Sequence, residues 1–309
     1  MRWGDMRRSD NVEDVTGGQP AGGGGMPFGG GLKLGGGAMI LVVIVSLLFG
    51  VNPLQFLGMM DTGAPPAPAP RPQTAQPGYG PQGTTGTQSA QGAKGAEDAD
   101  KGLSVRVLGD TEDVWTALFQ AMGSRYEPPK LVLFRRSIVS ACGRASAASG
   151  PFYCPADRKL YLDTAFFQEL QNRFGAPGDF GQAYVIAHEV GHHVQNLMGT
   201  MREFDAASAR LDERQRNALS VRLELQADCY AGVWGFYAAK RNLLEPGDAE
   251  EGLRAASAVG DDAIQKKTQG YVVPDGFTHG KAEQRMQWFQ TGLRSGDPRA
   301  CNTFAAKGP

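Results

Sequence analysis

The sequence predicts an α+β fold, mainly helical with a small sheet, for residues 101–309. Residues 113–122 have the apolar spacing of a helix. Two short apolar runs, 131–134 and 159–163, have the composition of strands, and little strand pattern follows them. Further helices are expected to start near Thr164, Phe180, Met201, Ser220, Gly247 and Gly280. The domain should therefore place a few strands beside a helical body.

The first third of the chain differs in composition from the rest. Residues 1–37 are polar and glycine-rich, and such a segment is expected to be disordered because it cannot bury enough apolar surface. Residues 38–60 hold an uncharged apolar run and predict one transmembrane helix, although a signal-peptide core or a buried strand would also fit. Residues 61–100 are rich in Pro, Gly and Gln and predict a disordered linker.

Basic residues predict the orientation of the anchor. Arg2, Arg7, Arg8 and Lys33 precede the apolar run, and the first basic residue after it is Arg71. The N-terminus is therefore expected in the cytoplasm, with the domain periplasmic or extracellular and the chain a single-pass protein of the inner membrane. The apolar run begins far from the N-terminus, which favours an uncleaved anchor. The net charge of −1 gives no reason to expect nucleic acid as a partner.

Residues 188–192 read H-E-V-G-H inside a segment with apolar, helix-compatible flanks. Positions i and i+4 share one face of a helix, so His188 and His192 can both reach one zinc ion. Glu189, beside them, can act as the general base toward water. The motif also occurs by chance in ordinary helices, and Gly191 indicates either a close neighbouring helix or a purely structural role.

A third ligand is expected from a later helix. Six residues after His192 a metzincin would have histidine, but this chain has Met198. Glu224 and Asp228 lie at i and i+4 in an apolar segment, so both face one side. Glu224 can complete a His-His-Glu zinc site, and Asp228 can accept a hydrogen bond from a ligand histidine. The alternative is a solvated acidic pair on a surface helix.

These motifs resemble the neutral zinc metallopeptidase family of bacteria. The resemblance rests on H-E-V-G-H-H at 188–193, E-L-Q-A-D-C-Y-A-G at 224–232, and segments 150–157, 161–163, 277–280 and 283–285. It covers most of the chain and implies a glutamate-zincin fold and peptidase activity, without naming a substrate. Zincin clefts run along an edge strand, and 159–163 is the expected one.

Four cysteines, an even number in a domain expected to be exported, predict disulfides. Of three pairings, Cys142–Cys154 and Cys229–Cys301 are expected, since the first closes a short loop and the second ties the C-terminus to the helix of Glu224. Free buried thiols are the alternative.

The two remaining histidines are less diagnostic. His193 points about 100° away from His192 around the helix, so it is expected to be a packed or surface residue. His279, in T-H-G with Arg285 six residues later, is similar to a T-H-P segment of HtpX-like membrane peptidases, except for Gly280. Such a histidine can donate to the oxyanion of peptide hydrolysis, with Tyr230 and Tyr271 as weaker candidates; a structural hydrogen bond is the equal alternative.

The sequence therefore predicts a membrane-anchored zinc endopeptidase with Glu189 as base, acting on protein or peptide substrates. One alternative is a zinc-bearing, non-catalytic scaffold or binding protein of the cell envelope, although a scaffold has no need of Glu189. Another is an amidase of cell-wall peptides, although no wall-binding module is recognisable.

Overall fold

A four-stranded sheet and a separate hairpin make up the β structure. The computed structural model describes residues 1–17, 86–146 and 149–305. The sheet has the order β1-β2-β6-β5; β1, β2 and β6 are parallel neighbours, and β5 is antiparallel to β6. The strands are β1 (Val12–Asp14), β2 (Lys130–Phe134), β3 (Ser137–Ser140), β4 (Gly143–Ser146), β5 (Phe152–Cys154) and β6 (Lys159–Asp163). The small sheet is as predicted, and both predicted strands belong to it as β2 and β6.

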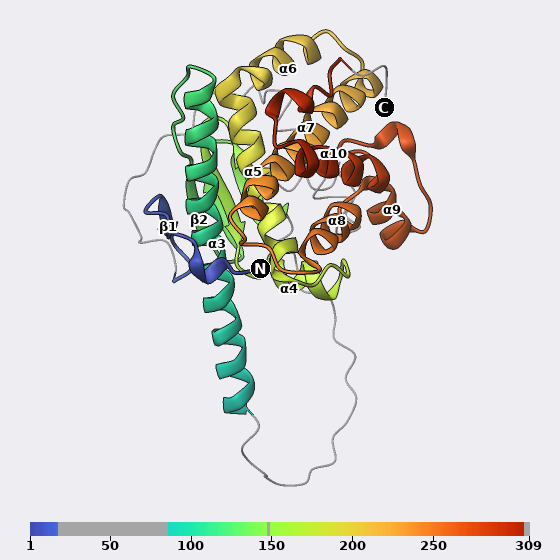
Figure 1. The fold of residues 1–309 in the computed structure, drawn as a ribbon. Coiled ribbons are helices and arrows are strands. Elements are labelled where there is room, and N and C mark those ends of the chain that lie inside the picture. The colour runs from blue at the N-terminus through green and yellow to red at the C-terminus, as the bar shows by residue number, and fades with distance from the viewer. Residues whose placement is uncertain (18–85, 147–148, 306–309) are drawn as a thin grey trace, which may run out of the picture.

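Helices form most of the described chain (Figure 1). They are α3 (Gly86–Ala121), α4 (Phe166–Asn172), α5 (Asp179–Met198), α6 (Thr200–Ser208), α7 (Glu213–Lys240), α8 (Asp248–Ala258), α9 (Asp261–Gln269) and α10 (Ala282–Ser295), with short 3-10 turns η1 (Trp3–Asp5), η3 (Pro274–Gly276) and η4 (Pro298–Cys301). The mainly helical α+β prediction is confirmed, although α9 was not foreseen because only two residues separate it from α8.

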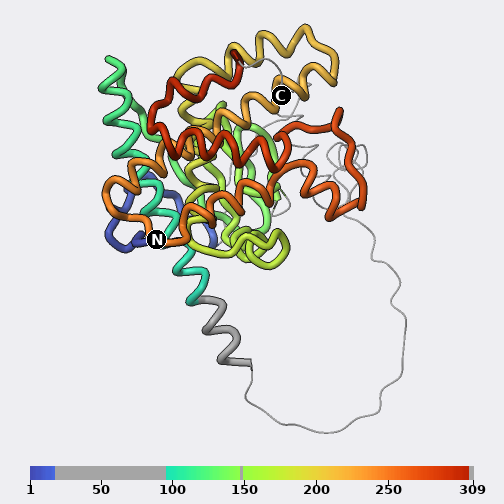
Figure 2. Tube along the Cα trace, turned by 45° about the vertical axis from the view of Figure 1, so that its right-hand side comes forward, coloured from blue at the N-terminus to red at the C-terminus, as the bar shows by residue number. Residues whose placement is uncertain are grey.

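Local signals explain where the helices of the site begin and end. α7 begins after Asp212, whose side chain accepts from the backbone of Gln215 in a capping box, so it starts about two turns earlier than predicted. α5 ends at Gly199, which has φ 86°, a conformation that glycine adopts easily. The two helices pack against each other in the core, with α3 mainly against α5 and α10 against α7. Figure 2 shows the same arrangement of the chain from a second direction.

The α7–α10 crossing depends on glycine. A Cβ atom on Gly232 would collide with the backbone of Phe289, and one on Gly292 would collide with the carbonyl of Cys229. Close backbone approach at this crossing lets α10 carry Arg285 into the interior, where only 3% of its surface is exposed. α7 and α10 are thus fixed to one another near the candidate site.

The N-terminal residues belong to the folded domain. Val12 of β1 pairs with Leu131 of β2, and the side chains of Ser9 and Asn11 donate to Glu112 of α3. The prediction that residues 1–37 are disordered is therefore wrong for 1–17. The glycine runs on which it was based begin only at Gly17, and the short segment before them packs on surfaces supplied by α3 and β2.

The shared sheet also bears on the predicted orientation. Strands that exchange backbone hydrogen bonds must lie on the same side of any membrane. A cytoplasmic N-terminus with an exported domain would separate β1 from β2, so the pairing argues against this combination, and the location of the protein stays a prediction. The predicted anchor, residues 38–60, lies outside the described residues, and no described helix is long and apolar enough to span a bilayer.

The predicted boundary between linker and domain at residue 101 is also wrong. α3 already begins at Gly86, so residues 86–100 are helical rather than a disordered linker. Two ion pairs of Glu97 stabilise this polar part of the helix. Its Oε2 lies 2.6 Å from Nη2 of Arg135, and its Oε1 lies 3.4 Å from Nζ of Lys101. Residues 61–85 of the predicted linker lie outside the described part of the chain.

The edge strand beside α5 is β5 and not β6. β6 lies between β2 and β5, so the prediction that 159–163 forms an edge is wrong. Tyr153 of β5 accepts a hydrogen bond at 2.8 Å from Asn196 of α5, which holds this edge against the helix. The short β5 strand carried too little pattern to be recognised in the sequence.

Candidate metal centre

Two histidines of α5 and one glutamate of α7 converge. Nε2 of His188 lies 3.2 Å from Oε2 of Glu224, and Nε2 of His192 lies 3.5 Å from Oε1. The three side chains offer ligand atoms that all lie within 4.8 Å of one another. Gly191, between the histidines, permits this because a Cβ there would stand 2.9 Å from the carbonyl oxygen of Ala227 on α7. The structure thus brings the three predicted ligands together.

The other ring nitrogen of each histidine already has a partner. Nδ1 of His188 lies 2.9 Å from Oδ1 of Asp228, and Nδ1 of His192 lies 2.9 Å from Oε1 of Gln195. Both partner oxygens accept, so each Nδ1 carries a proton, and in the neutral ring Nε2 keeps a lone pair directed toward Glu224. Two neutral imidazole nitrogens and one carboxylate are the donor set that catalytic zinc sites use, and the residues therefore fit this metal.

Electrostatics favour the charged form of the ligand carboxylate. Burial alone would raise the pKa of Glu224, but His192 and His279 outweigh it and hold that pKa well below its ordinary value. Burial likewise opposes protonation of His188, yet Asp228 and Glu224 raise its pKa to about 9. The carboxylate of Glu224 is thus kept charged where it faces the two imidazoles.

Asp228 lies at the centre of a buried network. It is fully buried, and it accepts hydrogen bonds from His188, from the hydroxyl of Tyr184 at 2.5 Å and from Arg285 at 2.9 Å. Burial would raise the pKa of Asp228, but Arg285 and His188 lower it below its ordinary value. The carboxylate therefore stays charged, and the predicted position of Asp228 behind a ligand histidine matches its contacts.

Glu189 has a different environment from the ligand carboxylate. It is half-buried on α5, between the two ligand histidines in sequence, and is not part of the cluster formed by the ligand atoms. Burial raises the pKa of Glu189 above its ordinary value, and His192 and His188 only partly oppose this. A carboxylate with a raised pKa is better suited to exchange protons near neutral pH.

His279 lies beside the ligand cluster on the loop before α10. Its Nδ1 is 3.1 Å from Oδ1 of Asp261, and Oδ2 of Asp261 accepts from the backbone amides of Thr278, His279 and Gly280 at 2.7–3.0 Å. Burial would lower the pKa of His279, but Glu224 and Asp261 raise it. Asp261 therefore fixes the loop and the Nδ1 edge of the His279 ring. Glu224 lies near enough to raise the pKa of His279 through its negative charge.

The other histidine and the tyrosines lie apart from the cluster. His193 is fully buried, with Nδ1 3.0 Å from the hydroxyl of Tyr153 and Nε2 2.7 Å from the carbonyl of Glu127, so of the two predicted alternatives, packed or surface, it is packed. The hydroxyl of Tyr230 points to Met198, and Tyr271 is exposed on the loop after α9. Neither tyrosine is placed as a partner of the ligands.

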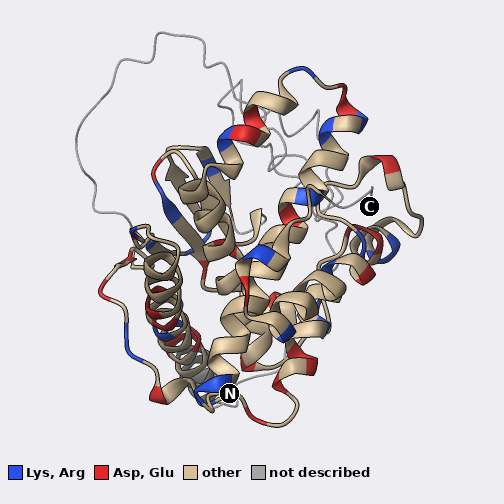
Figure 3. Cartoon of the chain, turned by 45° about the horizontal axis from the view of Figure 1, so that its top comes forward, with Lys and Arg blue, Asp and Glu red and all other residues tan. Residues whose placement is uncertain are grey.

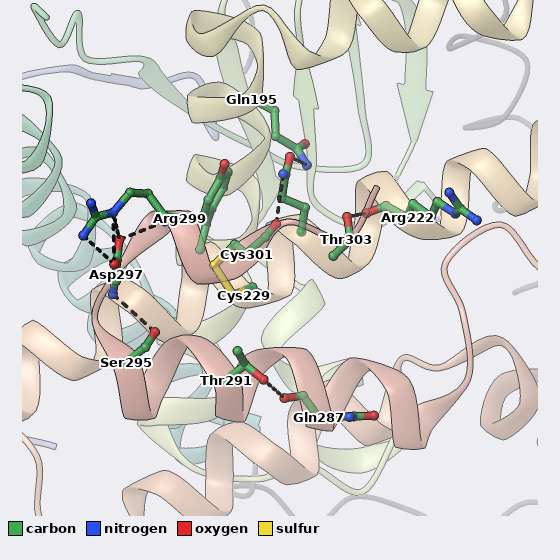
Figure 4. The surroundings of a disulfide bond; sticks show 12 residues. Gln195, Arg222, Cys229, Gln287, Thr291, Ser295, Asp297, Arg299, Cys301 and Thr303 are labelled. Carbon is green, nitrogen blue, oxygen red and sulfur yellow. Dashed lines mark hydrogen bonds and ion pairs between the residues drawn. A yellow bond between two sulfur atoms is a disulfide. The ribbon is translucent and has the colours of Figure 1, made fainter. Parts of the chain in front are cut away.

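Both predicted disulfides are present. Cys142, in the turn between β3 and β4, is joined to Cys154 of β5, and Cys229 of α7 is joined to Cys301 of η4. The second bond lies in the interior beside α10 (Figure 4). It holds the end of the described chain against the helix that carries Glu224 and Asp228.

The sequence did not indicate the contacts of three residues at the site. Gln195 contacts His192, Asp261 contacts His279, and Arg285 contacts Asp228. Gln195 follows His192 by three positions on one helix, a spacing that could have indicated contact. Asp261 and Arg285 gave no such local signal, because both reach the site from elements distant in sequence.

A second acidic cluster is already engaged. Asp179, Asp248 and Glu251 offer oxygens within 4.8 Å of one another at the start of α5. The amino group of Met1 lies 2.7 Å from Asp179 and 3.3 Å from Asp248, and Glu251 accepts from the amide of Phe180. The carboxylates of this cluster therefore bind the amino group of Met1, and Glu251 caps the start of α5.

Comparisons with known proteins agree with the geometry. The family model described as "Putative neutral zinc metallopeptidase" matches residues 1–304. "Uncharacterized protein YpfJ" of Escherichia coli strain K12 is 43% identical over 307 residues, covering 98% of this chain and 99% of that protein. "Uncharacterized protein Rv2575" of Mycobacterium tuberculosis strain H37Rv is 43% identical over 220 residues, covering 68% of this chain and 73% of that protein. No solved structure matches the chain. The chain therefore belongs to the neutral zinc metallopeptidase family.

Proposed function

We propose that this protein is a zinc-dependent endopeptidase with His188, His192 and Glu224 as metal ligands. One observation carries the proposal: the two Nε2 atoms and the Glu224 carboxylate face one another while both Nδ1 atoms are already hydrogen-bonded. A structural role for buried histidines would not require that both free nitrogens face a single carboxylate. Zinc, when bound, would lower the pKa of a water molecule toward 7 and polarise the peptide carbonyl.

Glu189 is the proposed general base. Its raised pKa and partial exposure suit a group that takes a proton from the attacking water and later delivers it to the leaving amine. Its conjugate acid is stabilised by burial, so the proton is retained until the C–N bond breaks. Asp228 and Arg285 support His188 from behind and do not contact the substrate in this proposal.

His279 is the proposed donor to the oxyanion. Asp261 accepts from Nδ1–H, so Nε2 carries a hydrogen only when the ring is doubly protonated, and the raised pKa of His279 favours that form. Loss of one such donor typically costs about 10²–10³-fold in kcat. In the assay below, His279→Ala should lower kcat with little change in KM; a purely structural histidine would instead lower thermal stability.

The substrate and location remain part of the proposal. Two disulfides favour an oxidising compartment outside the cytoplasm, and membrane contact through residues 38–60 stays a prediction. Acidic and basic residues are interspersed over the described helices and strands (Figure 3), and the net charge of −1 gives no reason to expect nucleic acid as a partner. Four reactive thiols in protein taken unreduced from its native compartment would contradict the exported location.

The test of the enzyme is Glu189→Gln in the full chain. Glu189 is not a ligand, so the variant should keep zinc and fold while cleavage of a denatured protein substrate falls by about 10²–10⁴-fold. Glu203→Gln, an exposed acid on α6, is the matched control and should retain full activity. Full complementation of a deletion strain by Glu189→Gln, with no substrate accumulating, would refute the peptidase and favour a non-catalytic scaffold.

A further inference from the structure

A chain of buried hydrogen bonds connects a ligand histidine to the C-terminal disulfide. Nδ1 of His192 lies 2.9 Å from Oε1 of Gln195, and Nε2 of Gln195 donates to Oε1 of Gln226 at 3.1 Å. Nε2 of Gln226 donates to the carbonyl of Cys301 at 3.0 Å. Gln195 is fully buried and Gln226 is 8% exposed. Figure 4 shows Gln195 in the surroundings of the Cys229–Cys301 bond.

The direction of this chain is fixed at two backbone carbonyls. A carbonyl oxygen only accepts, so Gln226 must present its NH₂ group to Cys301. Gln195 must likewise present its NH₂ group to the carbonyl of Leu223, 2.7 Å away, and to Oε1 of Gln226. The oxygen of Gln195 is then the atom left to face His192. The ring must donate from Nδ1, and its Nε2 keeps the lone pair that faces Glu224.

We propose that Gln195 and Gln226 are positioning residues that set the tautomer and ring orientation of His192, and that the Cys229–Cys301 disulfide anchors the far end of their chain. The inference rests on the metal site of the proposed function. Gln226 and Cys229 lie one turn apart on α7, and the disulfide holds the carbonyl of Cys301 over that turn. Thr303, which donates to the carbonyl of Arg222, adds a second and weaker attachment of this end.

Because Gln226 contacts His192 only through Gln195, the proposal predicts a specific pattern of zinc affinities. Partners behind a ligand histidine are typically worth about 10- to 100-fold in metal affinity, so Gln195→Ala should weaken zinc binding by about that factor. Gln226→Ala should weaken it less, because Gln195 keeps its bond to Leu223. The double variant should equal Gln195→Ala alone, since Gln226 acts only through Gln195. General loosening of the core would instead make the two effects add.

Two matched controls separate this chain from ordinary stability. Asn196→Ala removes an amide from the neighbouring position of α5, where it donates to Tyr153 and not to a ligand, and should leave zinc affinity unchanged. Cys229→Ser with Cys301→Ser should weaken zinc binding, whereas Cys142→Ser with Cys154→Ser should not, because that disulfide lies outside the chain. In the Gln226→Ala background, loss of Cys229–Cys301 should have no further effect.

The experiment is competition for zinc with a chromogenic chelator, using the full chain, with thermal unfolding of each variant measured in parallel. Unchanged affinity in folded Gln195→Ala overturns the inference and leaves the peptidase intact. Should Gln195→Ala fail to fold, Gln226→Ala decides: unchanged affinity overturns the inference, and weakened affinity supports it. A wild-type protein that binds no zinc overturns both the inference and the proposed function.

Discussion

Gly191→Ala tests whether the contact between α5 and α7 sets the geometry of the ligands. An added Cβ would lie 2.9 Å from the carbonyl oxygen and 3.1 Å from the Cα of Ala227. These are backbone atoms, which cannot rotate away, so one helix must move by a few tenths of an ångström. His188 and His192 move with α5 and Glu224 with α7, so the shift acts directly on the three ligands.

The magnitude follows from two opposing effects. Alanine in a helix is favoured over glycine by about 1 kcal/mol, whereas forcing an extra carbon into a packed interface costs about 1–3 kcal/mol. The net loss of unfolding free energy should be between about 0 and 2 kcal/mol, with roughly 2–4 °C in Tm for each kcal/mol. Zinc affinity should fall as well, because the ligand atoms separate.

Gly181→Ala is the matched control on the same helix. Its Cβ would meet the Cβ of Ala255 at 3.5 Å, an ordinary van der Waals contact. Differential scanning calorimetry and chelator competition on both variants provide the assay. If Gly191→Ala is as stable as Gly181→Ala and binds zinc as tightly as wild type, the close approach of the helices does not govern the site.

Two further predictions concern charged contacts. Asp228→Asn should weaken zinc binding by about 10- to 100-fold and, by leaving Arg285 buried without its counter-charge, cost about 3–5 kcal/mol of stability in urea unfolding; no change in either would contradict the network. The hydrogen bond from Lys159 lowers the pKa of Glu13, so the stabilisation it gives is complete above the ordinary glutamate pKa and is lost as the pH falls through the lowered value. Between about pH 7 and pH 3, the Tm of wild type should therefore fall more than that of Glu13→Gln, and equal slopes would exclude this contribution.

The ligand residues were predictable because helical periodicity is local. Two histidines at i and i+4 and two acids at i and i+4 show which side chains share a face, and the α5–α7 crossing then brings the faces together. The cysteine pairings followed from loop length and position in the chain. Each of these signals lies within one element or in the order of elements.

Features set by contacts between distant segments were not predictable. Residues 1–17 carry too little apolar surface to indicate a fold, since their partners in α3 and β2 supply the rest. Gln195 has the sequence appearance of an ordinary polar helix residue, and its role depends on Leu223 and Gln226 of another helix. The sequence of residues 159–163 predicts a strand, but its inner position in the sheet depends on pairing with both β2 and β5.

Residues 1–17 are attached to the domain through β1, and the next described residue is Gly86, the first of α3. Glu13 and Lys130 lie 117 positions apart and still form an ion pair at 3.3 Å. Cleavage of the backbone between Gly17 and Gly86 would remove none of the pairs between β1 and β2. The product would be a two-chain, non-covalent complex whose short chain is retained by strand pairing and by Glu112. A clipped preparation would therefore separate into two bands under denaturing conditions and still elute as one folded species.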